Sequence, residues 1–293
     1  MKILILRERM REQLFKMMEK EGVLPPFPEI IARLREMIED PDVGINEVAK
    51  VIQSDPILTG KLIQLANSVY GGGSAFFATD LNRALSRLGL KMAMDLAYSL
   101  KLSNMFSKDD YIDKNKFWRY SLALAVISSR LAKVYGAKQE EMSYAYLGGL
   151  MRNLGALLFS SLIPEEYGEL IEKLRLQVEK APLRRKLMAM EPLEEKAFGA
   201  SSAEIAGYYV RRWWSVEQPV LDYIECRSKI LLPEIPQVVE IGRYFLALEG
   251  IEDGILALQV GLPERYFTEK LEISPEQYKE LQLALQESLS ILS

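Results

Sequence analysis

Apolar residues recur along most of the chain at the three- and four-residue spacing that places them on one face of a helix. A clear example runs over residues 27–38 and consists of Phe27, Ile30, Ile31, Leu34, Met37 and Ile38. Longer stripes cover residues 115–135 and 139–162. No segment shows a convincing alternation of apolar and polar residues, the pattern of half-buried strands. The pattern therefore predicts an all-α fold.

Local signals place several helix ends. Asp55-Pro56 combines an N-cap carboxylate with proline at the first helical position, so a helix is expected from Pro56 to about Asn67-Ser68. Thr79 is expected to cap the next helix, which Gly89 closes. Near the end of the chain, the segment Ser274-Pro275-Glu276-Gln277 is typical of a capping box and predicts the start of the last helix.

Glycines mark two further features. Tyr70-Gly71-Gly72-Gly73-Ser74 lacks a preceding strand and a following Gly-Lys-Ser/Thr, so we interpret it as a plain loop rather than a phosphate-binding loop. Gly148, Gly149 and Gly155 fall inside the stripe 139–162, which we expect to form a single helix. Because each glycine costs a helix about 1 kcal/mol relative to alanine, we expect these three to permit close packing.

Composition excludes several classes of function. The chain has 293 residues, of which 49% are hydrophobic, and a net charge of −4 from 37 Lys+Arg and 41 Asp+Glu. It contains no histidine, which excludes every His-dependent catalytic triad and every metal site that needs an imidazole. Mild acidity without a long basic run argues against nucleic acid as a partner.

The compartment is predicted from cysteine use and from the lack of targeting signals. Cys226 is the single cysteine and cannot form an internal disulfide. The apolar start at residues 3–6 is too short for a signal-peptide core, and no stretch approaches the ~20 apolar residues of a membrane span. We therefore expect a cytoplasmic protein that has no membrane partner.

Four short motifs, in order and spacing, resemble the bacterial HDOD family, the "HD-related output domain". They are Leu24-Pro25-Pro26-Phe27-Pro28-Glu29, Ser54-Asp55-Pro56-Ile57-Leu58-Thr59, Leu65-Ala66-Asn67-Ser68 and Ala84-Leu85-Ser86-Arg87-Leu88-Gly89. The resemblance covers roughly residues 22–230. It implies a multi-helix bundle with a core like that of HD metal-dependent phosphohydrolases, a bacterial origin and a role in signalling.

The resemblance also implies a domain organisation. An N-terminal helical extension, residues 1–21, precedes an HDOD domain at 22–230. This domain divides into an N-terminal helical subdomain at 22–110 and an HD-like bundle at 111–230. Helices in the remaining segment, 231–293, are expected to pack on the HD-like part.

In HD enzymes, His and Asp side chains hold one or two metal ions that activate water for attack on a phosphoester. The resemblance places other residue types at these ligand positions, namely Tyr120, Arg152, Asn153, Ser202, Arg227 and Ser228. Arginine stays protonated and has no lone pair to give a metal. Asp222 and Glu225 lie nearby in sequence and are interpreted as surface residues of an amphipathic helix. We therefore expect no metal, no cofactor and no catalysis by the HD mechanism.

Two interpretations of the arginines stay open. Arg152 and Arg227 could bind an anion in the former metal pocket, which would make the protein a sensor of a nucleotide or phosphate. Alternatively, each arginine pairs with an acidic neighbour such as Glu204 or Glu225 and closes the pocket.

The expected function is that of a non-catalytic regulatory module that binds one or more protein partners of a bacterial signalling pathway. The alternative is an anionic small-ligand sensor that uses the degenerate pocket to bind a nucleotide or phosphate.

Overall fold

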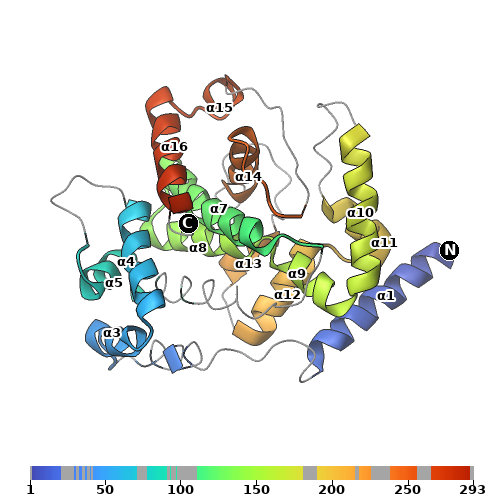
Figure 1. Ribbon diagram of the computed structural model, residues 1–293, viewed down its shortest axis with the longest axis horizontal. Helices are drawn as coiled ribbons and strands as arrows, with labels where there is room; N and C mark the ends of the chain where they lie inside the picture. The colour runs from blue at the N-terminus through green and yellow to red at the C-terminus, as the bar shows by residue number, and fades with distance from the viewer. Residues whose placement is uncertain are drawn as a thin grey trace.

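The computed structural model describes residues 2–20, 42–70, 78–90, 111–180, 190–214, 218–225, 238–255 and 265–290, together with isolated positions at 30, 33, 34, 37, 40, 93 and 97. All regular elements in these ranges are helices, as the hydrophobic pattern predicts (Figure 1). No helix in this part of the chain is long and apolar enough to span a membrane.

The centre of the molecule is a pair of helices, α7 (Lys114–Val134) and α8 (Gln139–Met151). They are joined by a short turn in which Gly136 has a φ of 83°, the left-handed conformation that favours glycine. The predicted apolar face of α7 is buried, including Phe117, Leu124 and Leu131. Its other sides are buried as well, and they include small residues such as Ala125 and Ser128, so neighbouring helices surround α7.

Gly148 and Gly149 permit the close packing that the sequence predicts. A Cβ atom on Gly149 would lie 2.8 Å from the carbonyl oxygen of Leu124 on α7. A Cβ atom on Gly148 would collide with Cβ of Tyr223, which belongs to α13 (Gln218–Glu225). Helix α8 is therefore held tightly between α7 and α13.

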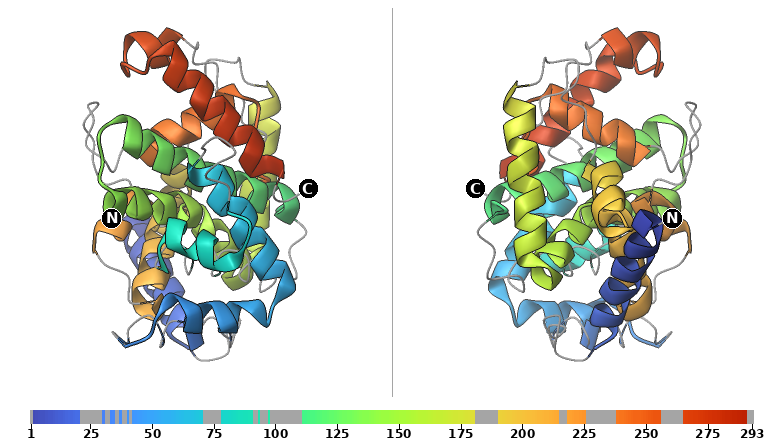
Figure 2. Two further views of the ribbon diagram at one scale, coloured as in Figure 1. Left: turned by 90° about the vertical axis from the view of Figure 1, so that its left-hand side faces the viewer. Right: turned by 90° about the vertical axis from the view of Figure 1, so that its right-hand side faces the viewer.

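Helices α3 (Ile45–Gln53), α4 (Pro56–Tyr70) and α5 (Leu81–Leu88) form a group at one end of the molecule (Figures 1 and 2). The predicted cap at Asp55 is confirmed, because its carboxylate accepts a hydrogen bond of 3.0 Å from the Leu58 N–H. The predicted end of α4 at Asn67-Ser68 is wrong. Asn67 stays helical and turns its side-chain amide to Ala78, accepting from the backbone N–H at 2.7 Å and donating to the carbonyl at 3.0 Å.

The cap of α5 also differs from the prediction. Asp80, and not Thr79, accepts the hydrogen bond from the Arg83 N–H, at 2.9 Å. A carboxylate is the stronger acceptor, and Thr79 accepts a hydrogen bond from the Arg83 guanidinium instead. The predicted closure at Gly89 is confirmed by its φ of 75°.

The stripe 139–162 does not form one helix. It divides into α8 and α9 (Leu154–Leu162), with a turn at Arg152 and Asn153 between them. Beyond α9 follow α10 (Pro164–Lys180), α11 (Met190–Phe198) and α12 (Ser202–Trp214). Helix α12 packs on α9 and α13, and α10 packs on α9.

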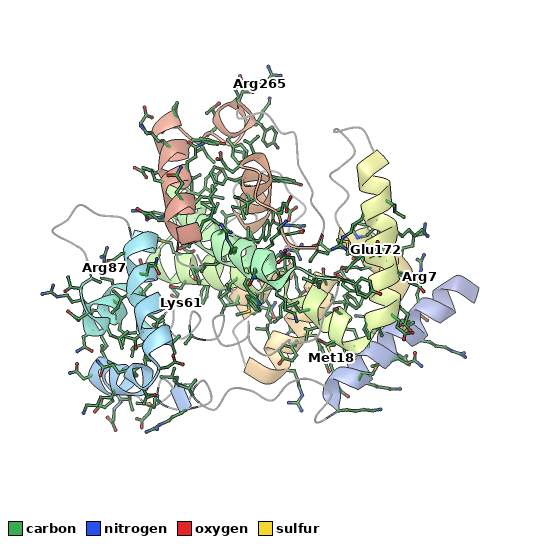
Figure 3. The ribbon with its side chains drawn as sticks, viewed as in Figure 1. Arg7, Met18, Lys61, Arg87, Glu172 and Arg265 are labelled. Carbon is green, nitrogen blue, oxygen red and sulfur yellow. The ribbon has the colours of Figure 1, made fainter. Side chains whose placement is uncertain are left out.

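The C-terminal helices α14 (Val238–Leu248), α15 (Arg265–Glu269) and α16 (Pro275–Ser290) lie on the α7 side of the central pair, where α14 and α16 pack on α7. The predicted capping box of α16 is present, since Ser274 and Gln277 exchange two hydrogen bonds. Helix α1 (Lys2–Glu19) lies at the opposite end from α3–α5 and packs on α9 and α11. Figure 3 marks this separation, with Arg7 and Met18 on α1 and Lys61 and Arg87 on the α3–α5 group. The predicted domain boundaries remain a prediction.

Candidate functional site

The break between α8 and α9 positions two of the predicted site residues. Arg152 ends α8 and Asn153 precedes α9. Gly155, in the first turn of α9, has no room for a side chain, because a Cβ atom would collide with the backbone of Ser202. The start of α12 is therefore pressed against the start of α9, and the break brings Arg152 and Ser202 to one region of the molecule.

Arg152 is almost fully buried and forms an ion pair with Glu191 of α11. Its side chain is 4% exposed, and its Nη2 lies 2.5 Å from Oε1 of Glu191. The Glu191 side chain is 18% exposed. Losing the hydration of both ions is costly, and direct contact in a weakly screened interior is what offsets that cost.

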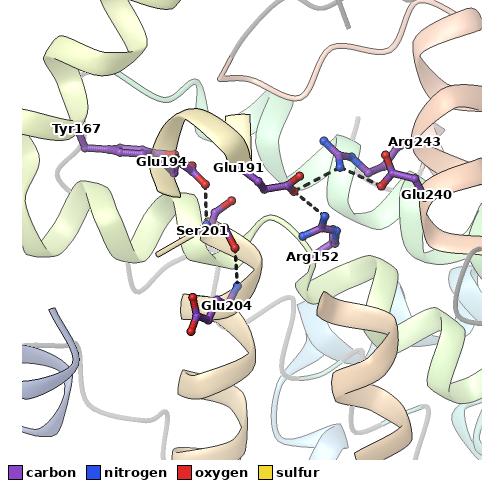
Figure 4. A network of polar contacts seen from close by, with 9 residues as sticks. Arg152, Tyr167, Glu191, Glu194, Ser201, Glu204, Glu240 and Arg243 are labelled. Atoms are coloured by element: carbon purple, nitrogen blue, oxygen red, sulfur yellow. Dashed lines mark hydrogen bonds and ion pairs between the residues drawn. The ribbon is translucent and has the colours of Figure 1, made fainter. Parts of the chain in front are cut away.

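A second arginine reaches the same carboxylate from α14. Nη1 of Arg243 lies 3.4 Å from Oε1 of Glu191 and 3.0 Å from Oε2 of Glu240 (Figure 4). The four side chains Arg152, Glu191, Arg243 and Glu240 form a cluster, which we call the ion-pair network. Its two guanidiniums and two carboxylates have no net charge. The network ties the α8–α9 break, α11 and α14 together.

Opposing effects act on the pKa of Glu191. Burial alone would raise the pKa, but Arg243 and Arg152 stabilise the charged carboxylate and lower it below its ordinary value. Glu191 is therefore ionised at neutral pH, and the network stays charged.

Tyr120 of α7 lies at the edge of this network. Its side chain is buried, and burial raises the pKa of the phenol far above its ordinary value, with the Arg243 guanidinium acting in the opposite direction. A neutral phenol is a poor metal ligand, so Tyr120 contributes packing and hydrogen-bonding capacity here.

Ser202 is held by a second acidic residue of α11. Oε2 of Glu194 accepts a hydrogen bond of 2.6 Å from the Ser202 N–H at the start of α12, and Oε1 accepts one of 2.8 Å from the Tyr167 hydroxyl. Glu194 is fully buried. Burial raises the pKa of Glu194 to about 7, which the hydrogen bonds from Ser202 and Tyr167 oppose and the nearby Glu191 reinforces.

Helix α11 thus joins the two halves of the site. Glu191 and Glu194 are three residues apart, so they lie on one face of the helix. Glu191 holds Arg152 and Arg243, while Glu194 holds Tyr167 and the start of α12.

Arg152 was expected to pair with an acidic neighbour such as Glu204 or Glu225, and the acidic partner that the structure shows is Glu191. Glu204 forms its ion pair with Arg11 of α1. Glu225 lies against Gly207 of α12, where a Cβ atom would be 2.6 Å from its Oε1. Glu191 reaches Arg152 because α11 lies beside the α8–α9 break.

The remaining predicted residues add little to the site. Asn153 is half-buried and makes no capping hydrogen bond. Arg227 and Ser228 lie outside the described residues, as does Cys226. Asp222 accepts a hydrogen bond of 2.8 Å from Gln218 one turn earlier on α13.

The residues at the described positions do not fit a metal ion. A guanidinium that is paired with Glu191 has no lone pair to offer, and its charge would repel a cation. Within the described ranges, no group of three or more His, Cys, Asp or Glu side chains could hold a metal. That these positions correspond to HD metal ligands stays a prediction.

Sequence reasoning missed Glu191, Glu194, Glu240 and Arg243. Glu191 and Glu194 occur in a charged stretch that is typical of a solvent-exposed helix, and Glu240 and Arg243 are the two charged residues of the mostly apolar stretch 238–248. The i, i+3 spacing of Glu191 and Glu194 is the one local signal, but it does not distinguish a buried face from an exposed one.

Solved structures with similar folds come from several bacteria. An HDOD domain protein of unknown function from Geobacter sulfurreducens has a TM-score of 0.63 at 20% identity, covering 98% of this chain and 93% of that one. A "Putative signal transduction protein" from Marinobacter aquaeolei VT8 has a TM-score of 0.64 at 20% identity, covering 98% and 65%. A "Putative metal-dependent phosphohydrolase" from Shewanella amazonensis SB2B has a TM-score of 0.64 at 17% identity, covering 98% and 99%. At these identities the likeness shows the shared fold.

Sequence comparison gives the family. An uncharacterized protein of Treponema pallidum (strain Nichols) is 26% identical over 214 residues, which are 73% of this chain and 39% of that protein. The chain thus spans well under two thirds of this relative. The family model of the HDOD domain matches residues 24–230, most of the chain. The all-helical fold and this match together show that the chain belongs to the HDOD domain family.

Proposed function

We propose that the protein is a non-catalytic regulatory module of a bacterial signalling pathway, and that it acts by binding other proteins. The observation that carries the proposal is the buried contact between Arg152 and Glu191. This contact supports the proposal, because the family resemblance expects a metal ligand at Arg152, and a permanently charged guanidinium that is ion-paired with Glu191 cannot serve as one.

The ion-pair network supports a structural role for this pocket. A catalytic metal site needs an open coordination position for water or substrate. Here the carboxylate of Glu191 is shared by two arginines, and the second arginine is engaged by Glu240. The groups that would face a phosphoester are thus already bound to each other.

Two measurements on the purified full chain test the absence of catalysis. The first is metal content after purification without chelator, and the second is hydrolysis of bis(p-nitrophenyl) phosphate with and without added Mn²⁺. We expect no stoichiometric divalent metal and no Mn²⁺-dependent turnover. Turnover that requires Mn²⁺ and survives further purification would refute the proposal.

The binding role needs a separate test. Affinity capture from a lysate of the source cell, with quantitative mass spectrometry, is expected to recover a protein in stoichiometric amount. A reconstituted complex of the two purified proteins must then form at micromolar concentration. Failure of every captured protein to bind the purified chain would count against a protein partner.

The alternative is the anion sensor that uses Arg152 and Arg227. It has less support, because the charge of Arg152 is already neutralised by Glu191. Replacing both arginines by Met tests it directly, since the sensor predicts weaker binding of nucleotides such as ATP. Unchanged affinity for each nucleotide tried would remove this alternative.

A further inference from the structure

A second polar site lies at the far side of α11, where α1 packs against the bundle. An open cleft of about 580 Å³ is present between α1 and the α11–α12 turn. The residues of the cleft that matter here are Arg7, Arg11, Glu195, Lys196, Gly199 and Glu204. The cleft is broad and open to solvent, so a ligand would lie against its charged wall.

Helix α1 is held in a defined position, so the cleft has fixed walls. Gly199 has a φ of 78°, and a Cβ atom there would collide with the carbonyl oxygen of Arg7. The ring of Phe15 meets that of Tyr208 edge to face, with centroids 4.5 Å apart, and the Tyr208 hydroxyl donates to Glu19 at 2.7 Å. Apolar contacts add to this, since Leu14 and Met18 are fully buried.

One ion pair accounts for only some of the charged side chains in the cleft. Arg11 forms an ion pair with Glu204. Three charged residues then remain, the cations Arg7 and Lys196 and the exposed carboxylate Glu195, which leaves the cleft with one net positive charge.

Arg7 lines the cleft and its side chain is only partly exposed. Its Nε atom is buried and has no hydrogen-bond partner in the described part of the chain. A buried donor without an acceptor costs about 1–3 kcal/mol, and native proteins rarely leave one unless a water or an ion completes the site. Because protein atoms cover Nε, the terminal nitrogens of Arg7 are the donors for a ligand in the open cleft, and guanidinium nitrogens form strong, charge-assisted hydrogen bonds to phosphate oxygens.

We propose that this cleft binds a small phosphate-bearing anion, with Arg7 and Lys196 as its contacts and α1 as its outer wall. Arg7 precedes residues 24–230, the range that matches the family model, so the site is built on an addition to the HDOD domain. It is separate from Arg152 and from the ion-pair network. A failure of the proposed protein-binding role would leave this inference standing, and the converse also holds.

Inorganic pyrophosphate is the probe, titrated into the full chain by isothermal titration calorimetry. We expect saturable binding to one site, and a loss of at least tenfold in affinity in Arg7→Met. Arg9→Met is the matched control, because Arg9 lies on the same helix with its side chain exposed. Absence of saturable binding in the wild type, or equal losses in Arg7→Met and Arg9→Met, would overturn the proposal.

A second pair of variants tests the placement of α1 while keeping Arg7. Gly199→Ala is expected to push the α1 backbone away and to weaken pyrophosphate binding severalfold. Gly136→Ala is its control, because Gly136 has the same left-handed conformation but open space around it. Thermal unfolding of all four variants checks that each is folded at the temperature of the titration. Wild-type affinity in a folded Gly199→Ala variant would show that the α1 wall is not part of the site.

Discussion

Glu191 and Arg152 join two helices that are far apart in the sequence: Oε1 of Glu191 lies 2.5 Å from Nη2 of Arg152, at the break between α8 and α9. Arg243, which belongs to α14, contacts the same oxygen atom. One carboxylate thus holds α11, the α8–α9 break and α14 together, and its removal is expected to lower the stability of the fold.

Glu191→Gln is expected to destabilise the protein more than Arg152→Met. The Gln variant removes the carboxylate charge beside the buried guanidinium of Arg152, whereas Arg243 keeps Glu240, and loss of one partner of a buried pair costs about 3–5 kcal/mol. In Arg152→Met, Glu191 keeps Arg243, so we expect a loss of about 1.5–3 kcal/mol, the range for a hydrogen bond to a charged group. Urea denaturation measures both values. Arg83→Met is the control, because its pair with Asp80 is exposed and worth about 0–1 kcal/mol. Equal, small losses in all three variants would contradict a structural role for the network.

Glu194 is expected to make stability depend on pH between about 5 and 7. Burial raises the pKa of Glu194 to about 7 in the folded protein, whereas an unfolded Glu titrates near 4.5. Between these values the native state binds more protons than the unfolded state, so stability falls as pH rises through this window. Each unit of difference between the folded and unfolded pKa values corresponds to about 1.4 kcal/mol in the free energy of unfolding. The expected loss of stability across this window is therefore on the order of 3 kcal/mol. The chain has no histidine, so few other groups titrate in this range.

The Glu194→Gln variant separates this effect from the rest of the titration. Its amide oxygen can still accept from the Ser202 N–H, and it carries no charge. We expect a flat stability profile between pH 5 and 7 and a stability above that of the wild type at pH 8, both measured by urea denaturation. Glu195→Gln on the exposed side of α11 keeps the wild-type slope. A wild-type slope in Glu194→Gln would mean that another group titrates.

Gly155→Ala is expected to destabilise the fold, although alanine is the better helix former. The new methyl group would collide with the backbone of Ser202, and such overpacking costs about 1–3 kcal/mol. Gly60→Ala in α4 is the matched opposite case, because no atom lies within 4 Å of the new Cβ, and it is expected to stabilise by about 0.5–1 kcal/mol. Melting temperatures are expected to move in opposite directions. If both variants gained stability, the result would contradict the close contact between α9 and α12.

Asn67→Ala is expected to loosen the α3–α5 group. The substitution removes both hydrogen bonds to the backbone of Ala78, a residue that is 2% exposed. It also removes the hydrogen bond of 3.2 Å that the Arg87 guanidinium donates to the Asn67 side chain. Buried backbone groups left unpaired cost about 1–3 kcal/mol. Asn82→Ala, at an exposed position of α5, is expected to change stability by less than about 0.5 kcal/mol. Hydrogen exchange at Ala78 gives a local readout, and unchanged protection there would contradict the assignment.

Local chemistry determined much of what could be predicted. The cap at Asp55 and the capping box at Ser274 and Gln277 involve residues within three positions of each other, so their hydrogen bonds depend on few other parts of the chain. The need for close packing at Gly148, Gly149 and Gly155 was also visible, because glycine inside an apolar helix has a cost that packing must offset. The family motifs likewise came from the order of residues alone.

The tertiary structure decided the rest. The apolar periodicity continues across Arg152 and Asn153, so nothing local shows that the helix breaks there; the break appears where α11 and α12 pack against it. Glu204 and Glu191 look alike in sequence, yet one meets Arg11 and the other Arg152. An ion pair depends on which side chains meet and on how much water surrounds them, and both follow from the folded arrangement of distant segments.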